Sequence, residues 1–212
     1  MTSTKELFGT ATSENVFIQL VDEHDGERMA SEAEAVRALS GHTDWCLRAM
    51  PVADWNRDLT PWPAPPVFGK QSFGDGAEKT LEALLQTIKG DGRHYYLCGY
   101  SLAGLFALWA GYQTDVFSGI VAASPSVWYP DWIAYAESHP CLAPAVYLSL
   151  GDKEERTRNP VMATVGRAIQ RQQEILTAGG IRTTLEWNPG NHFVDSDKRT
   201  AKGIAWMLAQ TW

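Results

Sequence analysis

One stretch of the chain, residues 95–111 with the sequence YYLCGYSLAGLFALWAG, restricts the possible folds more than any other. It begins as a short aromatic run that favours a strand, turns through a glycine-flanked serine, Ser101, and continues as an uncharged apolar segment of helix length. Nucleophile elbows consist of a buried strand, a sharp turn that carries the nucleophile and a buried helix. Small neighbours are needed because the turn brings backbone segments close together. The stretch therefore predicts Ser101 as a nucleophile.

Length and composition limit the classes of protein to consider. A chain of 212 residues is long enough for an α/β domain with a substantial core, and we expect a single domain over residues 1–212. The net charge of −7 argues against a nucleic-acid partner. No apolar run approaches the ~20 residues of a membrane span. The first residues contain no apolar signal-peptide core, so we expect a cytoplasmic protein with no membrane partner.

The three cysteines show no metal-ligand spacing and lie in apolar stretches. Buried free thiols are the simplest interpretation, because unpaired cysteine is among the most buried residue types. We therefore expect no metal, and no motif in the sequence calls for another cofactor.

Apolar runs with strand character alternate with helical periodicity along the chain. The runs predicted as strands are residues 15–21, 45–52, 95–98, 117–123, 145–150 and 181–187. Between them we expect helices, of which one begins at a capping box in residues 31–34 and one is stopped by Gly90. A third begins at Asn159-Pro160. This alternation predicts an α/β fold, a three-layer αβα sandwich with a mostly parallel sheet of about six strands.

A proline-rich segment, residues 56–74, is predicted as a long loop without regular helix or central strand. Loops of this length are usually functional or cover part of the domain. In open parallel sheets the active site lies beyond the carboxyl ends of the strands.

A nucleophilic serine needs a general base, and His192 is the strongest candidate. It follows the last predicted strand in a tight loop beside Gly190, on the side of the sheet where Ser101 is expected. His24 also follows a strand on this side. The remaining histidines are expected at the opposite edge: His42, His94 and His139.

The base needs an orienting acid between the serine and the histidine in sequence. Asp152, Glu154 and Glu155 follow the strand that is expected there. We favour Glu154, because its position three residues after Gly151 lets its carboxylate fold back toward the histidine. Asp152 and then Glu155 are the alternatives. The order serine, acid, histidine is that of the α/β-hydrolases.

The oxyanion and substrate sites are less constrained by the sequence. The N–H of Leu102 is expected to be one oxyanion donor. The second oxyanion donor is predicted in the acidic loop after the first strand, at the backbone N–H of Glu23 or His24. Three aromatic side chains are expected to line the substrate pocket, although core packing is an alternative for the first: Trp128, Tyr100 and Trp55.

Residues 99–107, GYSLAGLFA, followed by residues 123–128, ASPSVW, resemble the esterase branch of the α/β-hydrolases. That branch includes the enterochelin (siderophore) esterases and S-formylglutathione hydrolase-like enzymes. The resemblance runs from the first strand to His192. It implies Ser101 as nucleophile, Glu154 or a neighbour as acid and His192 as base. It also implies a minimal α/β-hydrolase fold, because the leading strands and cap domain of larger relatives are lacking.

The chain departs from the family pattern in two places. Ala103 occupies a position of the elbow that is usually glycine, and alanine is small enough for the turn. The loop after the first strand, residues 22–26, lacks the glycine-rich oxyanion segment of many esterases and is acidic instead. Carboxylates beside a developing oxyanion are unfavourable unless they point away from it.

Together these features predict a serine hydrolase that cleaves a small carboxylic ester through an acyl-enzyme. A thioesterase or peptidase on the same triad stays open, since the triad does not select the leaving group. The alternative from another class is a non-catalytic binding domain that keeps the fold but lacks a complete oxyanion hole. The expected partner is a small ester. A siderophore trilactone is disfavoured because its iron complexes and the protein are both anionic.

Overall fold

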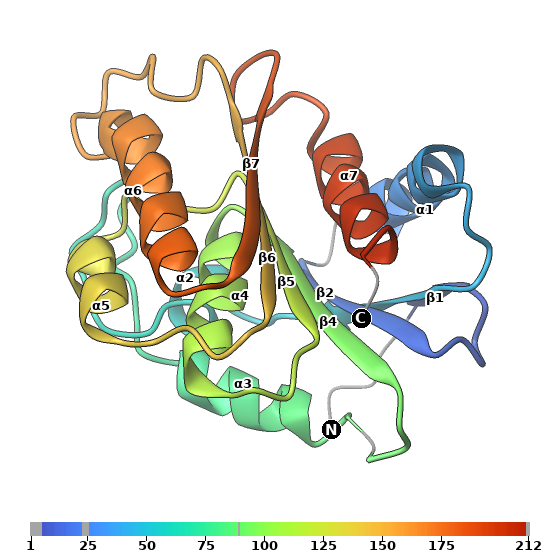
Figure 1. The fold of residues 1–212 in the computed structure, drawn as a ribbon. Helices are drawn as coiled ribbons and strands as arrows, with labels where there is room; N and C mark the ends of the chain where they lie inside the picture. Colours follow the sequence, from blue (N-terminus) through green and yellow to red (C-terminus); the bar gives the residue numbers. More distant parts are fainter. Residues whose placement is uncertain (1–5, 23–25, 89, 211–212) are drawn as a thin grey trace.

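The computed structural model describes residues 6–22, 26–88 and 90–210, and its strands form one twisted sheet (Figure 1). The strand order is β1-β3-β2-β4-β5-β6-β7. The bounds are β1 (Glu6–Gly9), β2 (Asn15–Val21), β3 (Cys46–Pro51), β4 (His94–Tyr100), β5 (Gly119–Ala123), β6 (Ala145–Gly151) and β7 (Arg182–Asn188). Strand β1 is antiparallel to β3, and all other pairs are parallel.

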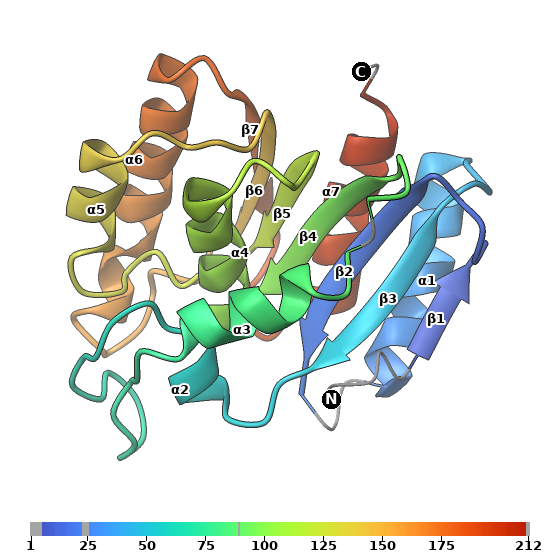
Figure 2. The ribbon, with the colours of Figure 1, turned by 90° about the horizontal axis from the view of Figure 1, so that it is seen from below.

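Helices cover both faces of the sheet, as Figures 1 and 2 show from two directions. One face carries α1 (Gly26–Ser40) and α7 (Ser196–Leu208). The other carries α3 (Ala77–Leu85), α4 (Leu102–Gln113), α5 (Trp132–Ser138) and α6 (Val165–Ala178). A short helix, α2 (Trp55–Asp58), and the 3-10 turn η1 (Met162–Thr164) lie in the connections. The three-layer αβα fold predicted from the sequence is confirmed.

The two faces of the sheet belong to two separate cores. In β2, Val16 and Ile18 pack into the core beneath α4, whereas Phe17 and Val21 pack into the core beneath α1 and α7. Successive side chains of a strand point to opposite faces, and both faces of a parallel sheet are buried. This double burial explains why the predicted strands read as continuous apolar runs.

Four details differ from the sequence-based expectations. The sheet has one strand more than the six expected, because β1 is a four-residue edge strand whose sequence carries little apolar signal. The predicted capping box is wrong, since α1 begins at Gly26 and Ser31 lies inside it. Its hydroxyl donates instead to Asp197 Oδ2 of α7, at 2.6 Å. Helix α3 ends at Leu85, before Gly90.

The fourth difference concerns the proline-rich segment. Helix α2 occupies its first residues, and Ala64 and Phe73 pair as an isolated antiparallel bridge.

At the start of the long helical segment, the Asn159 side-chain oxygen accepts hydrogen bonds from two backbone N–H groups, as the sequence predicts. The turn that it caps is η1, which precedes α6.

Within the ranges that the structure describes, every helix is too short or too polar to cross a membrane.

Candidate active site

The Ser101 turn joins β4 to α4 at the carboxyl edge of the sheet. Ser101 has φ +60° and ψ −121°, a conformation that is costly for a residue with a side chain. Three backbone hydrogen bonds hold it: its N–H donates to the Ala123 carbonyl, and its carbonyl accepts from the N–H groups of Leu105 and Ser126. The surrounding backbone therefore fixes where the Ser101 hydroxyl lies.

The backbone packs closely around the glycines on both sides of this turn, most tightly at Gly99. A Cβ on Gly99 would overlap the carbonyl of Ala103, and a Cβ on Gly104 would lie 3.1 Å from the Cα of Pro125. Ala103 itself is fully buried and fits the turn. Alanine at position 103 therefore fits the turn, although the family pattern usually has glycine there, because the close backbone contacts are made at Gly99 and Gly104.

Ser101, His192 and Glu154 form a continuous chain of hydrogen bonds. The Ser101 Oγ lies 3.0 Å from His192 Nε2, and His192 Nδ1 lies 2.7 Å from Glu154 Oε2. His192 comes from the loop after β7 and Glu154 from the loop after β6, so three strand ends supply the three groups. With a proton on Nδ1, the imidazole can accept the serine proton at Nε2.

The two alternative acids have other surroundings. Asp152 Oδ1 accepts a hydrogen bond of 2.8 Å from the Gly190 N–H and so holds the loop that carries His192. Glu155 is exposed, with its carboxylate next to Gly166 of α6. Of the three carboxylates, Glu154 is the one that the fold brings to His192.

The Glu154 carboxylate is buried and receives hydrogen bonds on both oxygens. Its Oε1 accepts from Ser124 Oγ, the Gly151 N–H and Arg199 Nη1, each at 2.7 Å, and its Oε2 faces His192. Burial alone would raise the pKa of Glu154. The hydrogen bond and charge of His192 and the hydrogen bonds from Ser124 and Gly151 outweigh burial and hold that pKa below its usual value. Glu154 is therefore a carboxylate at neutral pH.

Arg199, on α7, contacts the Glu154 carboxylate, and the sequence reasoning missed it. Its side chain is 1% exposed and pairs with Glu154. The same guanidinium donates to Ser124 Oγ at 3.0 Å, to the Tyr100 hydroxyl at 3.3 Å, and to the backbone carbonyls of Pro189 and Asn191 at 3.3 and 2.9 Å. One side chain thus holds both the acid and the loop before His192. The sequence offers no signal for this contact, because a charged residue on an amphipathic helix ordinarily faces solvent.

The predicted aromatic residues divide between the site and the core. The Tyr100 hydroxyl donates to the His192 carbonyl at 2.6 Å, and both Tyr100 and Trp55 line a cavity beside Ser101. Trp128 is 8% exposed and packs against Phe68 and Phe73, outside the described lining of that cavity. These contacts agree with core packing, which the sequence left open for Trp128 as the alternative to lining the pocket.

Of the two predicted oxyanion donors, one lies within the described residues and the other does not. Leu102 is the first residue of α4, and N–H groups in the first turn of a helix have no acceptor within the helix. Its N–H is therefore available next to Ser101. The second predicted donor, at His24 or Glu23, lies outside the described residues. A second hydroxyl, Ser126 Oγ, lies 3.5 Å from Ser101 Oγ.

A cavity of about 360 Å³ opens beside Ser101 and His192. This is within the usual size range of small-molecule sites. Its walls come from β2, α1, the start of α2, the Ser101 turn and α7: Gln19, Leu20, Asp22, Arg28, Met29, Glu32, Trp55, Tyr100, Ser101, His192, Phe193, Ser196, Asp197 and Thr200. Within the described part of the chain, no group of three His, Cys, Asp or Glu side chains is arranged to hold a metal ion.

Comparison with known proteins gives matches in structure alone. No family model matches the sequence, and no curated protein matches it. The IroE-like serine hydrolase from Shewanella oneidensis superposes with a TM-score of 0.71 at 20% identity, over 92% of this chain and 71% of that chain. The siderophore hydrolase EstB from Aspergillus nidulans gives a TM-score of 0.66 at 16% identity, over 93% and 83%.

The enterobactin hydrolase IroE in complex with DFP gives a TM-score of 0.67 at 16% identity, over 95% of this chain and 85% of that chain. The chain has the fold of these hydrolases. The α/β-hydrolase fold that the Ser101 segment and the ASPSVW segment implied is therefore confirmed. At these identities the likeness establishes the fold, and the chemistry must be argued from the site itself.

Proposed function

We propose that the protein is a serine hydrolase that cleaves a small carboxylic ester through an acyl-enzyme. The observation that carries this proposal is the unbroken hydrogen-bond chain from Ser101 Oγ through His192 to the buried carboxylate of Glu154. The names of the structural neighbours, which are hydrolases and esterases, add support. The strained turn at Ser101 then serves as a nucleophile elbow.

The reaction begins when Ser101 Oγ attacks the ester carbonyl and His192 Nε2 takes the serine proton. The resulting imidazolium is stabilised by the Glu154 carboxylate, which stays ionised. When the tetrahedral intermediate collapses, the bond to the alcohol breaks and the alcohol leaves with the proton from Nε2. The acyl group is then bonded to Ser101.

Water completes the cycle by the same route. His192 removes a proton from a water molecule, whose oxygen attacks the acyl carbonyl, and the proton returns to Ser101 as the acid is released. The Leu102 N–H, at the positive end of α4, is the expected donor to the oxyanion in both steps. The second donor is expected in the acidic loop at residues 22–26.

The cavity argues against an anionic substrate. Its described lining contains three carboxylates, Asp22, Glu32 and Asp197, against one guanidinium, Arg28. One structural neighbour is a siderophore hydrolase by name and another is an enterobactin hydrolase, but an iron–catecholate carries negative charge and would be repelled by such a lining. We therefore propose a neutral or cationic small ester as the substrate class.

The proposal is tested by turnover of p-nitrophenyl acetate in wild-type protein and in a Ser101→Ala variant. We expect the variant to lose activity by roughly 10⁴-fold or more, because nucleophile and base act as a unit. A Ser126→Ala variant is the matched control, since Ser126 also presents a hydroxyl in this region, and it should retain turnover. Undiminished turnover in Ser101→Ala would contradict the assignment. No turnover in folded wild-type protein would favour a non-catalytic binding domain.

A further inference from the structure

The wall of the active-site cavity contains an exposed aromatic side chain that the proposed mechanism does not use. Phe193 lines this cavity together with Ser101 and His192. It is 89% exposed, the highest value among the large hydrophobic residues of the described ranges. Single exposed hydrophobic residues are ordinary on protein surfaces. Phe193 is distinguished by its place, since no other exposed large hydrophobic residue of the described ranges lines the cavity.

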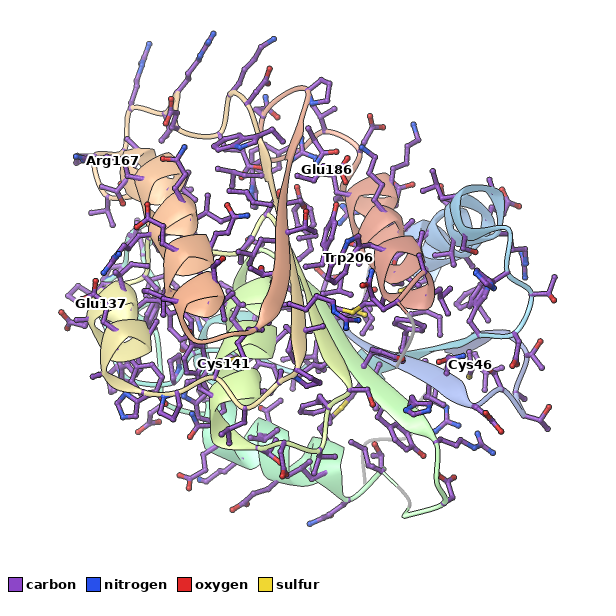
Figure 3. The ribbon with its side chains drawn as sticks, viewed as in Figure 1. Cys46, Glu137, Cys141, Arg167, Glu186 and Trp206 are labelled. Atoms are coloured by element: carbon purple, nitrogen blue, oxygen red, sulfur yellow. The ribbon has the colours of Figure 1, made fainter. Side chains whose placement is uncertain are left out.

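The loop that carries Phe193 crosses the carboxyl edge of the sheet from β7 to α7 (Figure 3). Hydrogen bonds hold its backbone on both sides of the ring. Asn191 Oδ1 accepts from the Phe193 N–H at 3.0 Å, and the Asn191 carbonyl accepts from Arg199 at 2.9 Å. The His192 carbonyl accepts from the Tyr100 hydroxyl at 2.6 Å. The fold therefore fixes the backbone at Phe193, and a substrate has to order only the side-chain rotamer.

The ring of Phe193 lies beside the proposed general base. It is edge-on to the His192 imidazole, with 5.5 Å between the ring centroids and an interplanar angle of 86°.

The proposed mechanism decides which part of an ester comes closest to this ring. His192 Nε2 passes its proton to the leaving alcohol, so the alcohol oxygen must come within about 3 Å of Nε2. The acyl part is bonded to Ser101 Oγ in the acyl-enzyme and has no such requirement. The alcohol part therefore extends from the reacting carbonyl on the side of His192, where Phe193 offers an uncovered apolar surface.

We propose that Phe193 is a specificity-determining residue, which binds the alcohol part of the substrate and selects esters of apolar, above all aromatic, alcohols. This inference rests on the proposed hydrolase function and adds a substrate class to it. Covering the ring removes apolar surface of both partners from water, which favours binding in proportion to the area covered. An aromatic alcohol adds an edge-to-face or offset-stacked ring contact. Such an ester also belongs to the neutral substrate class proposed above.

The test compares three esters, two of which are isomers. 2-Phenylethyl acetate carries a phenylethyl group on the alcohol side, methyl 3-phenylpropanoate carries it on the acyl side, and methyl acetate lacks it. The two leaving alcohols are similar in acidity, so the comparison reports binding more than intrinsic reactivity. With kcat/KM measured at pH 7 by acid release, we expect wild-type protein to prefer 2-phenylethyl acetate over methyl acetate by roughly fivefold or more.

Phe193→Ala should remove this preference selectively. The kcat/KM ratio of 2-phenylethyl acetate to methyl acetate should fall by roughly fivefold, because the apolar contact is lost. The ratio of methyl 3-phenylpropanoate to methyl acetate should stay as in wild-type protein. Phe193→Leu keeps an apolar side chain and should retain an intermediate preference for the aromatic alcohol.

Phe68→Ala is the matched control for these variants. Phe68 is also an exposed phenylalanine, 40% exposed, but it lies outside the described lining of the cavity. Its substitution should leave both ratios unchanged. Phe193 belongs to neither hydrophobic core of the described residues, so its variants should fold and unfold in urea as wild-type protein does.

Three results would overturn the proposal. One is a wild-type protein without preference for 2-phenylethyl acetate, and another is an unchanged alcohol ratio in Phe193→Ala. The third is an equal fall of kcat/KM for all three esters in Phe193→Ala, which would mean that Phe193 supports His192 and does not bind the alcohol. In each case, methyl acetate turnover that is lost in Ser101→Ala would still support the hydrolase function, so the two failures are distinguishable.

Discussion

Two buried hydrogen-bond acceptors, one on Glu154 and one on Gln19, differ in how fully the protein satisfies them. The Glu154 carboxylate accepts from Ser124, Gly151 and Arg199 and pairs with His192. The Gln19 carbonyl oxygen accepts from none of the described residues. The first acceptor is held in place before any substrate arrives, as electrostatic preorganisation requires.

The difference separates the proposed catalytic groups from the wall of the cavity. Weakening the Glu154 side should lower kcat for every ester, because the proposed mechanism uses the same acid and base for every substrate. Changing Gln19, which lies in the cavity wall, should leave this acid and base in place. The following predictions concern the Glu154 side, where the expected effects are larger.

Glu154→Gln should cause the largest loss. An amide cannot stabilise the His192 imidazolium and favours the wrong imidazole tautomer, and loss of this role costs about 10⁴-fold in kcat in serine proteases. The measurement is p-nitrophenyl acetate turnover at neutral pH. Glu155→Gln is the matched control, because Glu155 is the exposed neighbour that the sequence left as an alternative. Equal losses in both variants would refute the distinction between them.

Arg199→Met should cause the next largest effect, and it should appear in stability as well as in rate. Removing one partner of a buried ion pair costs about 3–5 kcal/mol of unfolding free energy. In the protein that remains folded, kcat should fall by about 10- to 100-fold, because the acid and the His192 loop lose a shared anchor. Urea unfolding and turnover measure the two effects.

Arg171→Met is the control for this second prediction. Arg171 also forms two ion pairs, with Glu137 and Glu174, but its side chain is 50% exposed. Exposed pairs contribute about 0–1 kcal/mol, so this variant should resemble wild-type protein. Arg199→Lys should recover only part of kcat, because an ammonium cannot reproduce the planar fork of the guanidinium. Full recovery by Arg199→Lys would show that charge alone matters.

The third and smallest effect is on acid stability. The pKa of Glu154 is lowered in the folded state from its usual value of 4.5, so between these two pKa values the unfolded chain binds more protons. The stabilisation of the folded state by the ionised Glu154 carboxylate is present above pH 4.5 and is lost as the pH falls through the folded-state pKa. Urea unfolding over this range should show a steeper acid loss for wild-type protein than for Glu154→Gln. Parallel curves would contradict the lowered pKa.

The sequence predicted the parts of the site that depend on local pattern. Ser101 was predicted from the glycines at 99 and 104, which permit the close turn, and His192 from its place after the last strand. Glu154 was favoured from its spacing to Gly151, whose N–H indeed donates to it. These inferences follow from the β/α alternation, which places strand ends at one edge.

What the sequence did not predict depends on contacts between distant segments. A charged residue on an amphipathic helix ordinarily faces solvent, so Arg199 carried no sign that a carboxylate 45 residues earlier would bury it. Gln19 likewise lay without comment in the predicted strand at residues 15–21, and its partner Glu32 belongs to a helix whose start was predicted wrongly. Strand β1 was missed because it is short and lies at the edge.

The most direct test of the central claim is covalent labelling of wild-type protein with a fluorophosphonate probe, followed by peptide mapping. We predict a single adduct on Ser101, no labelling of Ser101→Ala, and greatly slowed labelling of His192→Gln, because the base activates the nucleophile. An adduct on another residue, or labelling of Ser101→Ala at the wild-type rate, would contradict the assignment of Ser101 as the nucleophile.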